Sequence, residues 1–178
     1  MAGQRLTDKS ALAETLNSAD LLMCVDVSDT TGSAAGTSKK VLNKYIIQTD
    51  KVSLSNANVL DLENTPITLV AAPGSGYMIL PLSVTLVCTY AAATESGSVN
   101  MYIGYSNADN QYYWGKKYRV MYGATTDVVY TIGADYNINR GVHSTTISNL
   151  PLMVWTDVTY NGGWTADVYT TYQVVKLP

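Results

Sequence analysis

Residues 80–90 alternate between two sets of side chains, and no other feature of the sequence constrains the fold as strongly. One set is Leu80, Leu82, Val84, Leu86, Cys88 and Tyr90, and the other is Pro81, Ser83, Thr85, Val87 and Thr89. Because successive side chains of a β-strand point to opposite faces of the sheet, this alternation predicts a half-buried antiparallel strand. Such a strand needs partners on both edges and a covering layer, so the pattern favours a layered β-structure.

Further short segments rich in β-forming residues follow, separated by polar turns. We expect strands at residues 66–72, 99–105, 112–114, 118–122, 128–132, 145–147, 152–156 and 166–177. The turn at residues 73–76 predicts a hairpin between the first of these strands and the alternating strand, and residues 161–163 predict the turn into the last strand. About eight to ten strands at this spacing predict a mainly β fold, with an antiparallel β-sandwich or jelly roll over residues 59–178.

The last predicted strand is apolar on both faces. Val168, Tyr172 and Val174 face one way, and Tyr169, Val175 and Leu177 face the other. One face would then meet the core and the other a neighbouring subunit, or the strand would be central to two packed sheets. Both alternatives are compatible with the sequence.

Residues 1–50 have a different character and predict a small α+β segment for attachment and oligomerisation. A short helix is expected at residues 6–17, a strand at 21–27, a polar loop at 29–38 and a second short helix at 39–47. The first helix has a narrow apolar stripe, which three copies wound together would cover. Residues 48–58 are polar and predict a hinge, with residues 51–58 as the boundary between the two parts. The residues expected to attach or oligomerise the chain are Leu6, Leu12, Leu16, Leu21, Leu22, Val25, Val27, Lys39, Lys40 and Val41.

The charge of the chain is low, with a net charge of −3 and 14% charged residues. Because neither half of the chain has an excess of basic residues that would bind phosphates, we expect no nucleic-acid partner. The triplet Lys116, Lys117 and Arg119 is interpreted as the solvated end of a strand. No run of apolar residues reaches the length of about 18 that spans a membrane, and no secretory signal is expected. Cys24 and Cys88 lie far apart and are predicted to be reduced thiols.

The polar residues predict no catalytic or metal-binding site. His143 is the single histidine and has no partner for a zinc site or a catalytic triad. Asp135, Asn137 and Asn139 are spaced like ligands of a calcium loop, but Arg140 stands where that loop needs glycine. No pair of carboxylates is distinguished from the others. We therefore expect no metal, no cofactor and no enzymatic activity.

Aromatic residues are the best candidates for a binding function. The chain has 14 tyrosines and 3 tryptophans but no phenylalanine. Tyrosine combines a large apolar area with a polar tip, which suits subunit interfaces and sugar-binding faces. Tyr112, Tyr113 and Trp114 follow a polar loop, and Trp164 follows a predicted turn. These four residues could stack against a surface glycan, or they could serve the core and subunit packing.

Two parts of the sequence resemble structural appendages of tailed bacteriophages. Residues 20–22 (DLL), 25–31 (VDVSDTT) and 36–41 (GTSKKV) resemble the N-terminal leader of phage fibre and capsid-decorating proteins. Residues 64–76 (NTPITLVAAPGSG) resemble a hairpin of a phage domain, and residues 77–86 and 166–177 continue that similarity. The matched stretches cover less than half of the chain.

The resemblance implies a non-enzymatic virion structural protein, assembled in the host cytoplasm. It would be a head fibre or a capsid-decorating or fibre subunit, mounted through its N-terminal segment and projecting a β-domain. The implied partners are further copies of the chain, as a homotrimer, and capsid or tail proteins of the same virion. The alternative is a receptor-recognition module of a tail fibre that binds carbohydrate on the host surface.

Overall fold

The computed structural model describes residues 21–26, 28–31, 37–42, 46–105, 113–135 and 147–178. The chain divides into two compact units, residues 1–46 and residues 47–178, and each is described by itself. The first predicted helix, with Leu6, Leu12 and Leu16, lies outside the described residues, as does Val27. No helix among the described residues is both long enough and apolar enough to cross a membrane.

The first unit contains an antiparallel pair of strands. β1 (Leu21–Asp26) pairs with β2 (Thr37–Leu42), and Leu21 lies opposite Leu42. The predicted strand at residues 21–27 is therefore confirmed over residues 21–26, but the helix predicted at residues 39–47 is wrong for the part that β2 occupies. The reason is that β1 offers a complete row of backbone partners to this segment, which outweighs its weak helical pattern.

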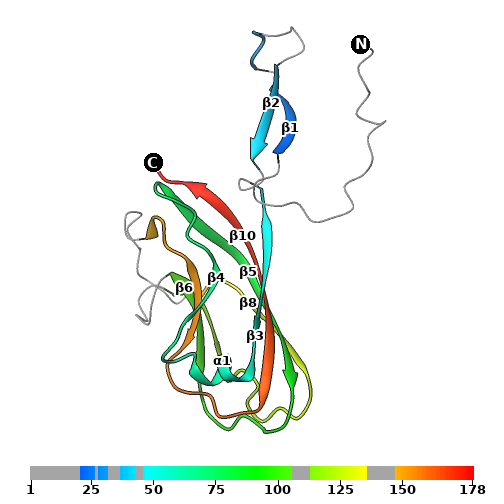
Figure 1. Ribbon diagram of the computed structural model, residues 1–178, viewed down its shortest axis with the longest axis vertical. Helices are drawn as coiled ribbons and strands as arrows, with labels where there is room; N and C mark the ends of the chain where they lie inside the picture. The colour runs from blue at the N-terminus through cyan, green and yellow to red at the C-terminus, as the bar shows by residue number, and fades with distance from the viewer. Residues whose placement is uncertain (1–20, 27, 32–36, 43–45, 106–112, 136–146) are drawn as a thin grey trace, which may run out of the picture. The chain divides into compact units, whose positions relative to one another are not determined.

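In its described residues, the second unit is a sandwich of two four-stranded antiparallel sheets (Figure 1). One sheet has the order β3-β10-β5-β8 and the other has the order β4-β9-β6-β7. The strands are β3 (Gln48–Leu54), β4 (Ile67–Val70), β5 (Tyr77–Tyr90), β6 (Asn100–Tyr105), β7 (Tyr113–Tyr118), β8 (Val128–Ile132), β9 (Leu152–Thr156) and β10 (Trp164–Lys176). The pairs β3–β10, β4–β9, β5–β8 and β6–β7 are nested in sequence, and this nesting is the jelly-roll topology. The predicted mainly β sandwich is confirmed.

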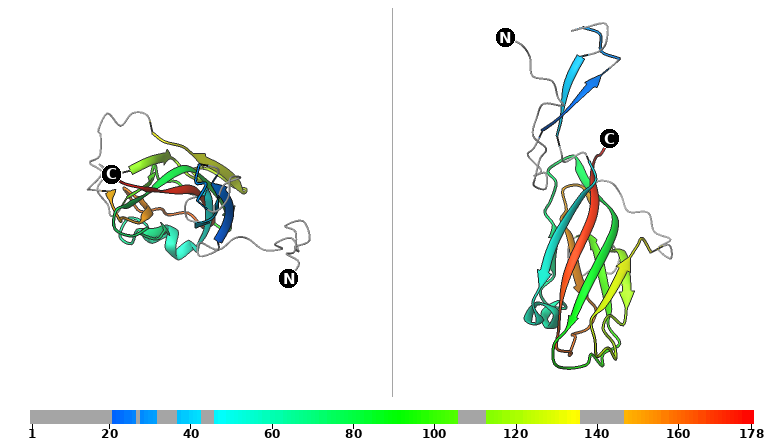
Figure 2. Two further views of the ribbon diagram at one scale, coloured as in Figure 1. Left: turned by 90° about the horizontal axis from the view of Figure 1, so that it is seen from above. Right: turned by 90° about the vertical axis from the view of Figure 1, so that its right-hand side faces the viewer.

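The core lies between the facing surfaces of the two sheets. In β10, Val168, Tyr172 and Val174 are buried in this core, whereas Tyr169 on the opposite face is 36% exposed. β10 lies between β3 and β5 in its sheet, as the right view of Figure 2 shows. The predicted division of the last strand into two faces is therefore confirmed, and only one face meets the second sheet.

A β-bulge changes the alternation within β5. Thr171 pairs with Ser83 but Tyr172 pairs with Pro81, so Leu82 is an extra residue in the ladder. An extra residue moves the following side chains to the other face of the strand. Leu80 and Leu82 are accordingly exposed, while Leu86 and its alternating neighbours are buried. The prediction that residues 80–90 present one continuous apolar face is wrong at its N-terminal end.

The predicted hairpin between residues 66–72 and the alternating strand is also wrong. The turn forms, with the Tyr77 amide donating to the Gly74 carbonyl at 3.2 Å. However, β4 pairs with β9 and β5 pairs with β10, so the connection crosses from one sheet to the other. Local turn chemistry predicts that the chain bends at this point, but it does not specify which strands pair afterwards.

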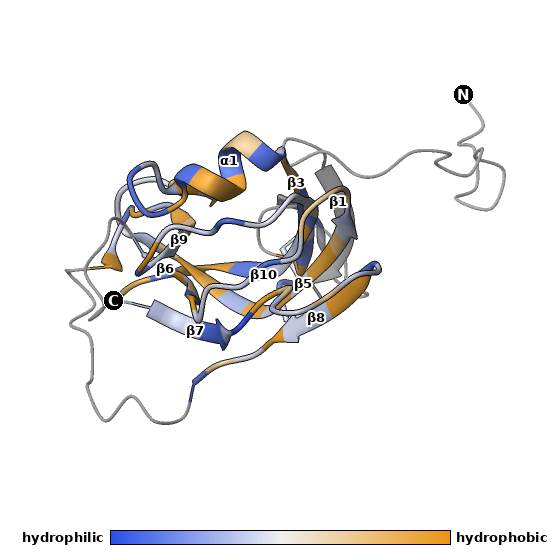
Figure 3. Ribbon diagram, turned by 90° about the horizontal axis from the view of Figure 1, so that it is seen from below, coloured by the Kyte–Doolittle hydropathy of each residue, from blue (hydrophilic) through white to orange (hydrophobic). Residues whose placement is uncertain are grey.

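The sequence predicts a hinge at residues 48–58, but the structure shows that these residues are part of the sandwich. They form β3 and the beginning of α1 (Asn56–Asp61), which lies beside β3 (Figure 3). The Ser55 side chain accepts a hydrogen bond from the Asn58 amide, and the Asn58 side chain accepts one from the Ser55 amide, which together cap the helix. β3 is polar because it is an edge strand, and charged side chains are common on such edges.

We expect Gly115→Ala to lower the free energy of unfolding by about 1–3 kcal/mol, the usual cost of overpacking. A Cβ atom at Gly115 in β7 would lie 2.4 Å from the Gly133 carbonyl oxygen, where the chain leaves β8. Backbone cannot move aside as a flexible side chain can. Gly133→Ala is the matched control, since its Cβ would meet nothing within 4 Å. Equal urea midpoints for the two variants would contradict this close approach.

Candidate functional site

Trp164 is fully buried, which excludes the glycan-stacking alternative for this residue and leaves the core-packing one. Its ring is 0% exposed and packs edge to face against Tyr160, with ring centroids 5.0 Å apart. The preceding turn folds back on residues 91–93: the amides of Ala91 and Ala92 donate to the Gly163 carbonyl at 2.8 and 3.1 Å. Trp164 therefore begins β10 on its inner face, and it cannot stack against a glycan.

Tyr113 and Trp114 are half-buried, and Tyr112 lies outside the described residues. Tyr113 packs edge to face on Tyr102, which is stacked on Trp155 with centroids 5.7 Å apart. Trp155 is buried, so these rings form a packed aromatic cluster rather than an open platform. The structure thus brings Tyr113 together with two rings that the sequence analysis did not select.

The hydroxyl of Tyr102 is part of this packed cluster. It donates to an Asp157 carboxylate oxygen at 3.3 Å. Burial, together with the nearby Asp157 charge, raises the pKa of Tyr102 to about 12. The hydroxyl therefore stays protonated at neutral pH, and its role is to donate a hydrogen bond.

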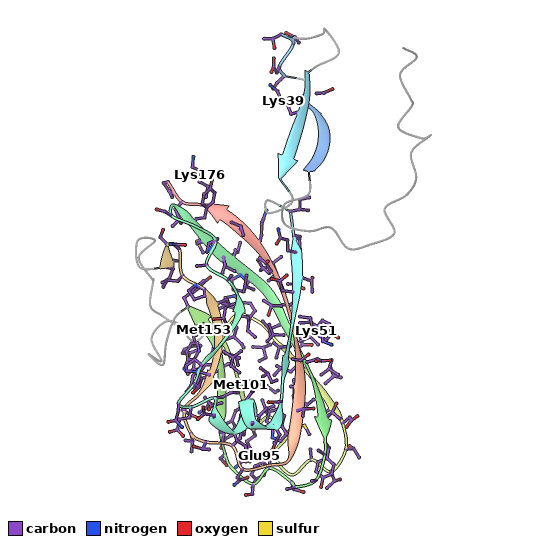
Figure 4. The ribbon with its side chains drawn as sticks, viewed as in Figure 1. Lys39, Lys51, Glu95, Met101, Met153 and Lys176 are labelled. Carbon is purple, nitrogen blue, oxygen red and sulfur yellow. The ribbon has the colours of Figure 1, made fainter. Side chains whose placement is uncertain are left out.

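The sequence analysis also missed Glu95, a buried carboxylate at one end of the sandwich (Figure 4). One of its oxygens accepts the Gly97 amide at 2.7 Å, and the other accepts the amides of Asn161 and Gly162 at 2.9 and 2.8 Å. Three backbone donors thus occupy the carboxylate. The Glu95 carboxylate joins the loop after β5 to the turn before β10. No sequence motif predicts this role.

Tyr118, Arg119 and Tyr122 form an exposed cluster, which we name the Tyr–Arg–Tyr cluster. The Arg119 guanidinium carbon lies 5.0 Å from the centre of the Tyr118 ring and 4.6 Å from that of Tyr122. The two rings are 49% and 45% exposed. The sequence analysis expects a strand at residues 118–122, but β7 ends at Tyr118 and the backbone turns, with φ of 58° at Arg119 and 59° at Met121.

The outer face of the β3-β10-β5-β8 sheet carries several exposed apolar side chains. Val87 of β5 and Val129 of β8 lie opposite each other, and Tyr169 of β10 lies in the adjacent row. Val129 is 62% exposed. The Lys51 ammonium, 5.7 Å from the Tyr169 ring centre, and its ion partner Asp167 border this face.

The described residues offer little to metal or nucleophilic chemistry. No group of three or more histidine, cysteine, aspartate or glutamate side chains among them is placed to hold a metal ion. Burial raises the pKa of the Cys88 thiol to about 12, so the thiol stays protonated and is a poor nucleophile at neutral pH. His143, Asn137 and Asn139 lie outside the described residues.

No family model and no curated protein matches this chain. The fold is similar to that of several solved structures at low identity. The chain titled "Cyanophage Pam1 capsid asymmetric unit" is 13% identical, with all of both chains covered and a TM-score of 0.39. A Cocksfoot mottle virus chain is 12% identical over 74% of this chain and 93% of its own, with a TM-score of 0.33. PRD1 vertex protein P5 is 8% identical over 93% and 86%, with a TM-score of 0.34. At these scores the similarities carry no argument about function.

Proposed function

We propose that the protein is a non-enzymatic structural protein of a tailed bacteriophage virion. In this proposal it is a head fibre or a capsid-decorating or fibre subunit. The supporting observation is the order of its two parts: a hairpin unit with the leader-like residues precedes an eight-stranded jelly roll. Jelly rolls occur in viral capsid proteins and also in lectins and cupins, so the fold alone does not select the function. The leader-like residues distinguish the first class from the other two.

In the proposed arrangement, the N-terminal unit attaches the protein to the particle. The β1–β2 ladder holds Leu21, Leu22, Val25, Lys39, Lys40 and Val41 on two adjacent strands. Lys39 forms an ion pair with Asp29, which also accepts hydrogen bonds from the Thr31 amide and hydroxyl. The partners would be other copies of the chain and the capsid or tail proteins of the same virion.

Labelling of virus particles tests the location. We expect particles purified on a density gradient, from the phage that encodes the chain, to contain it. A gold-labelled antibody against the full chain should mark repeated positions on the particle. The same antibody on particles from a phage lacking the gene is the control. Recovery of the chain only in the soluble fraction of the lysate would contradict a virion role.

The oligomeric state is a separate prediction. We expect the full chain to sediment at about three times the 19.2 kDa mass of one chain, as a closed trimer. Analytical ultracentrifugation at micromolar concentration measures this directly. A compact monomer under these conditions would contradict the trimer, while the labelling experiment would still decide the virion role.

A carbohydrate-binding receptor module is the second candidate function. Of the four residues for which the sequence left glycan stacking open, Trp164 is buried and Tyr113 belongs to a packed cluster. The observation that favours this class is instead the Tyr–Arg–Tyr cluster, whose two rings are exposed beside a cation.

A further inference from the structure

We propose that the Tyr–Arg–Tyr cluster binds an anionic saccharide. The acid group of the sugar would pair with the Arg119 guanidinium, and the sugar ring would lie against the exposed tyrosine rings. This inference rests on the second candidate function, for which it names the site and the class of ligand. It does not depend on the virion role.

The guanidinium is held in a fixed orientation. Its Nε and Nη2 atoms donate to the Ser98 hydroxyl oxygen at 3.3 and 3.2 Å, and its plane lies beside two aromatic rings. A guanidinium carries five N–H donors, and Ser98 engages those on one side. The opposite edge, with the Nη1 donors and the second Nη2 hydrogen, is the edge that the proposal assigns to the acid group. Because arginine is already oriented, less rotamer freedom is lost on binding.

The backbone that presents the cluster is equally fixed. The Arg119 amide donates to the Val99 carbonyl at 2.9 Å, and the Gly123 amide donates to the Glu95 carbonyl at 2.9 Å. Between them, Val120 and Met121 are buried and anchor the turn in the core. The Met121 amide donates to the Tyr130 hydroxyl at 3.0 Å. The exposed side chains therefore project from a turn that is formed before any ligand arrives.

The turn also holds two non-glycine residues in the left-handed region, Arg119 and Met121. Such residues are uncommon, and they concentrate where a side chain must be held in a particular direction for binding or catalysis. Met121 points into the core, while Arg119 is exposed. The conformation of this turn separates a buried anchor from an exposed cation within three residues.

The chemistry of the cluster selects the class of ligand. A planar guanidinium pairs with a carboxylate or phosphate through two parallel hydrogen bonds. Tyrosine rings provide apolar surface for a sugar and a hydroxyl for its polar groups. The charge of Asp157 acts on Tyr118, and the Asp157 carboxylate accepts hydrogen bonds from the Asn100 backbone amide and side chain at 2.9 and 2.5 Å. The cluster thus combines a fixed cation with two exposed rings, as an acidic sugar requires.

A titration of the full chain with trigalacturonic acid and with its trimethyl ester tests the proposal. The two probes share the sugar rings and differ only in the acid groups. We expect the acid to bind at least tenfold more tightly than the ester, and Arg119→Lys to weaken binding of the acid at least tenfold. The sialylated trisaccharide 3′-sialyllactose is titrated in parallel, to show whether a different acidic sugar binds more tightly. Equal binding of acid and ester, or no binding of either acidic saccharide, would overturn the proposal.

Two further variants keep the test decisive if the arginine variant fails to fold. Tyr122→Ala should weaken binding of the acid, whereas Tyr122→Phe, which keeps the ring, should retain most of it. Tyr169→Ala is the matched control, because it removes another exposed tyrosine beside a cation, on the other sheet. A loss of binding in Tyr169→Ala equal to that in Tyr122→Ala would contradict the assignment. Particle labelling is unaffected by these variants, so failure of this site and failure of the virion role are distinguishable.

Discussion

Replacing Trp164 with alanine is expected to lower the free energy of unfolding by about 3–5 kcal/mol. The indole is 0% exposed and contacts Tyr160 within the core at the start of β10. Its removal leaves a large cavity, which the surrounding β-ladder cannot close because Trp164 is paired with Tyr90 of β5 and β10 is paired on both sides from Ala166 onward. Urea unfolding followed by circular dichroism measures the loss. A loss of this size is a large part of the free energy of unfolding of an ordinary domain.

Tyr169→Ala is the matched control for this experiment. Tyr169 lies on the same strand but on its outer face, where it is 36% exposed. We expect this change to cost less than about 1 kcal/mol, as is usual for surface substitutions. If Trp164→Ala unfolded at the same urea concentration as the unchanged protein, the indole would have to lie at the surface. Glycan stacking, the other alternative that the sequence left open for Trp164, would then apply.

Replacing Glu95 with alanine is the second change with a large expected effect. It leaves the amides of Gly97, Asn161 and Gly162 without their acceptor. A buried donor that loses its partner costs about 1–3 kcal/mol, so we expect a total loss of about 3 kcal/mol or more. The connection between the loop after β5 and the turn before β10 should loosen first. Faster hydrogen exchange at Gly97 and Gly162 would show this, together with a lower urea midpoint.

Two variants bracket the effect of Glu95. Glu95→Gln keeps one acceptor oxygen but turns an amide group toward backbone donors. We therefore expect its free energy of unfolding to lie between those of the alanine variant and the unchanged protein. Glu63→Ala is the matched control, because Glu63 is exposed and accepts a hydrogen bond from the Thr159 hydroxyl at the surface. We expect it to change stability by about 0.5 kcal/mol at most. Equal effects of Glu63→Ala and Glu95→Ala would contradict the structural role of the buried carboxylate.

The strands with strong local patterns were predictable from the sequence. β9 and β8 fall where their apolar and β-branched residues place them, and β10 has the two predicted faces. The period of two is a property of each strand and needs no partner to be recognised. The same local reasoning misplaced residues 39–42 and 48–54, because both segments are strands only through pairing with β1 and β10.

The candidate sites show the same division. Composition indicated that tyrosine and tryptophan would matter, and the sequence identified Arg119 as part of a basic triplet. The sequence did not show that the Arg119 guanidinium contacts the rings of both Tyr118 and Tyr122. These contacts form only because β7 ends at Tyr118 and the backbone then turns. The turn before Trp164 left both glycan stacking and core packing open for this residue, and the packing of that turn on residues 91–93 decided for the core.

By itself the sequence determined the mainly β class and the position of most strands. These properties follow from local periodicity and turn chemistry, which act over a few residues. Only the tertiary structure decided the jelly-roll order of the strands, the bulge at Leu82 that exposes Leu80, and the buried carboxylate of Glu95. Each of these depends on residues distant in sequence, and their contacts gain free energy only once the two sheets have packed together.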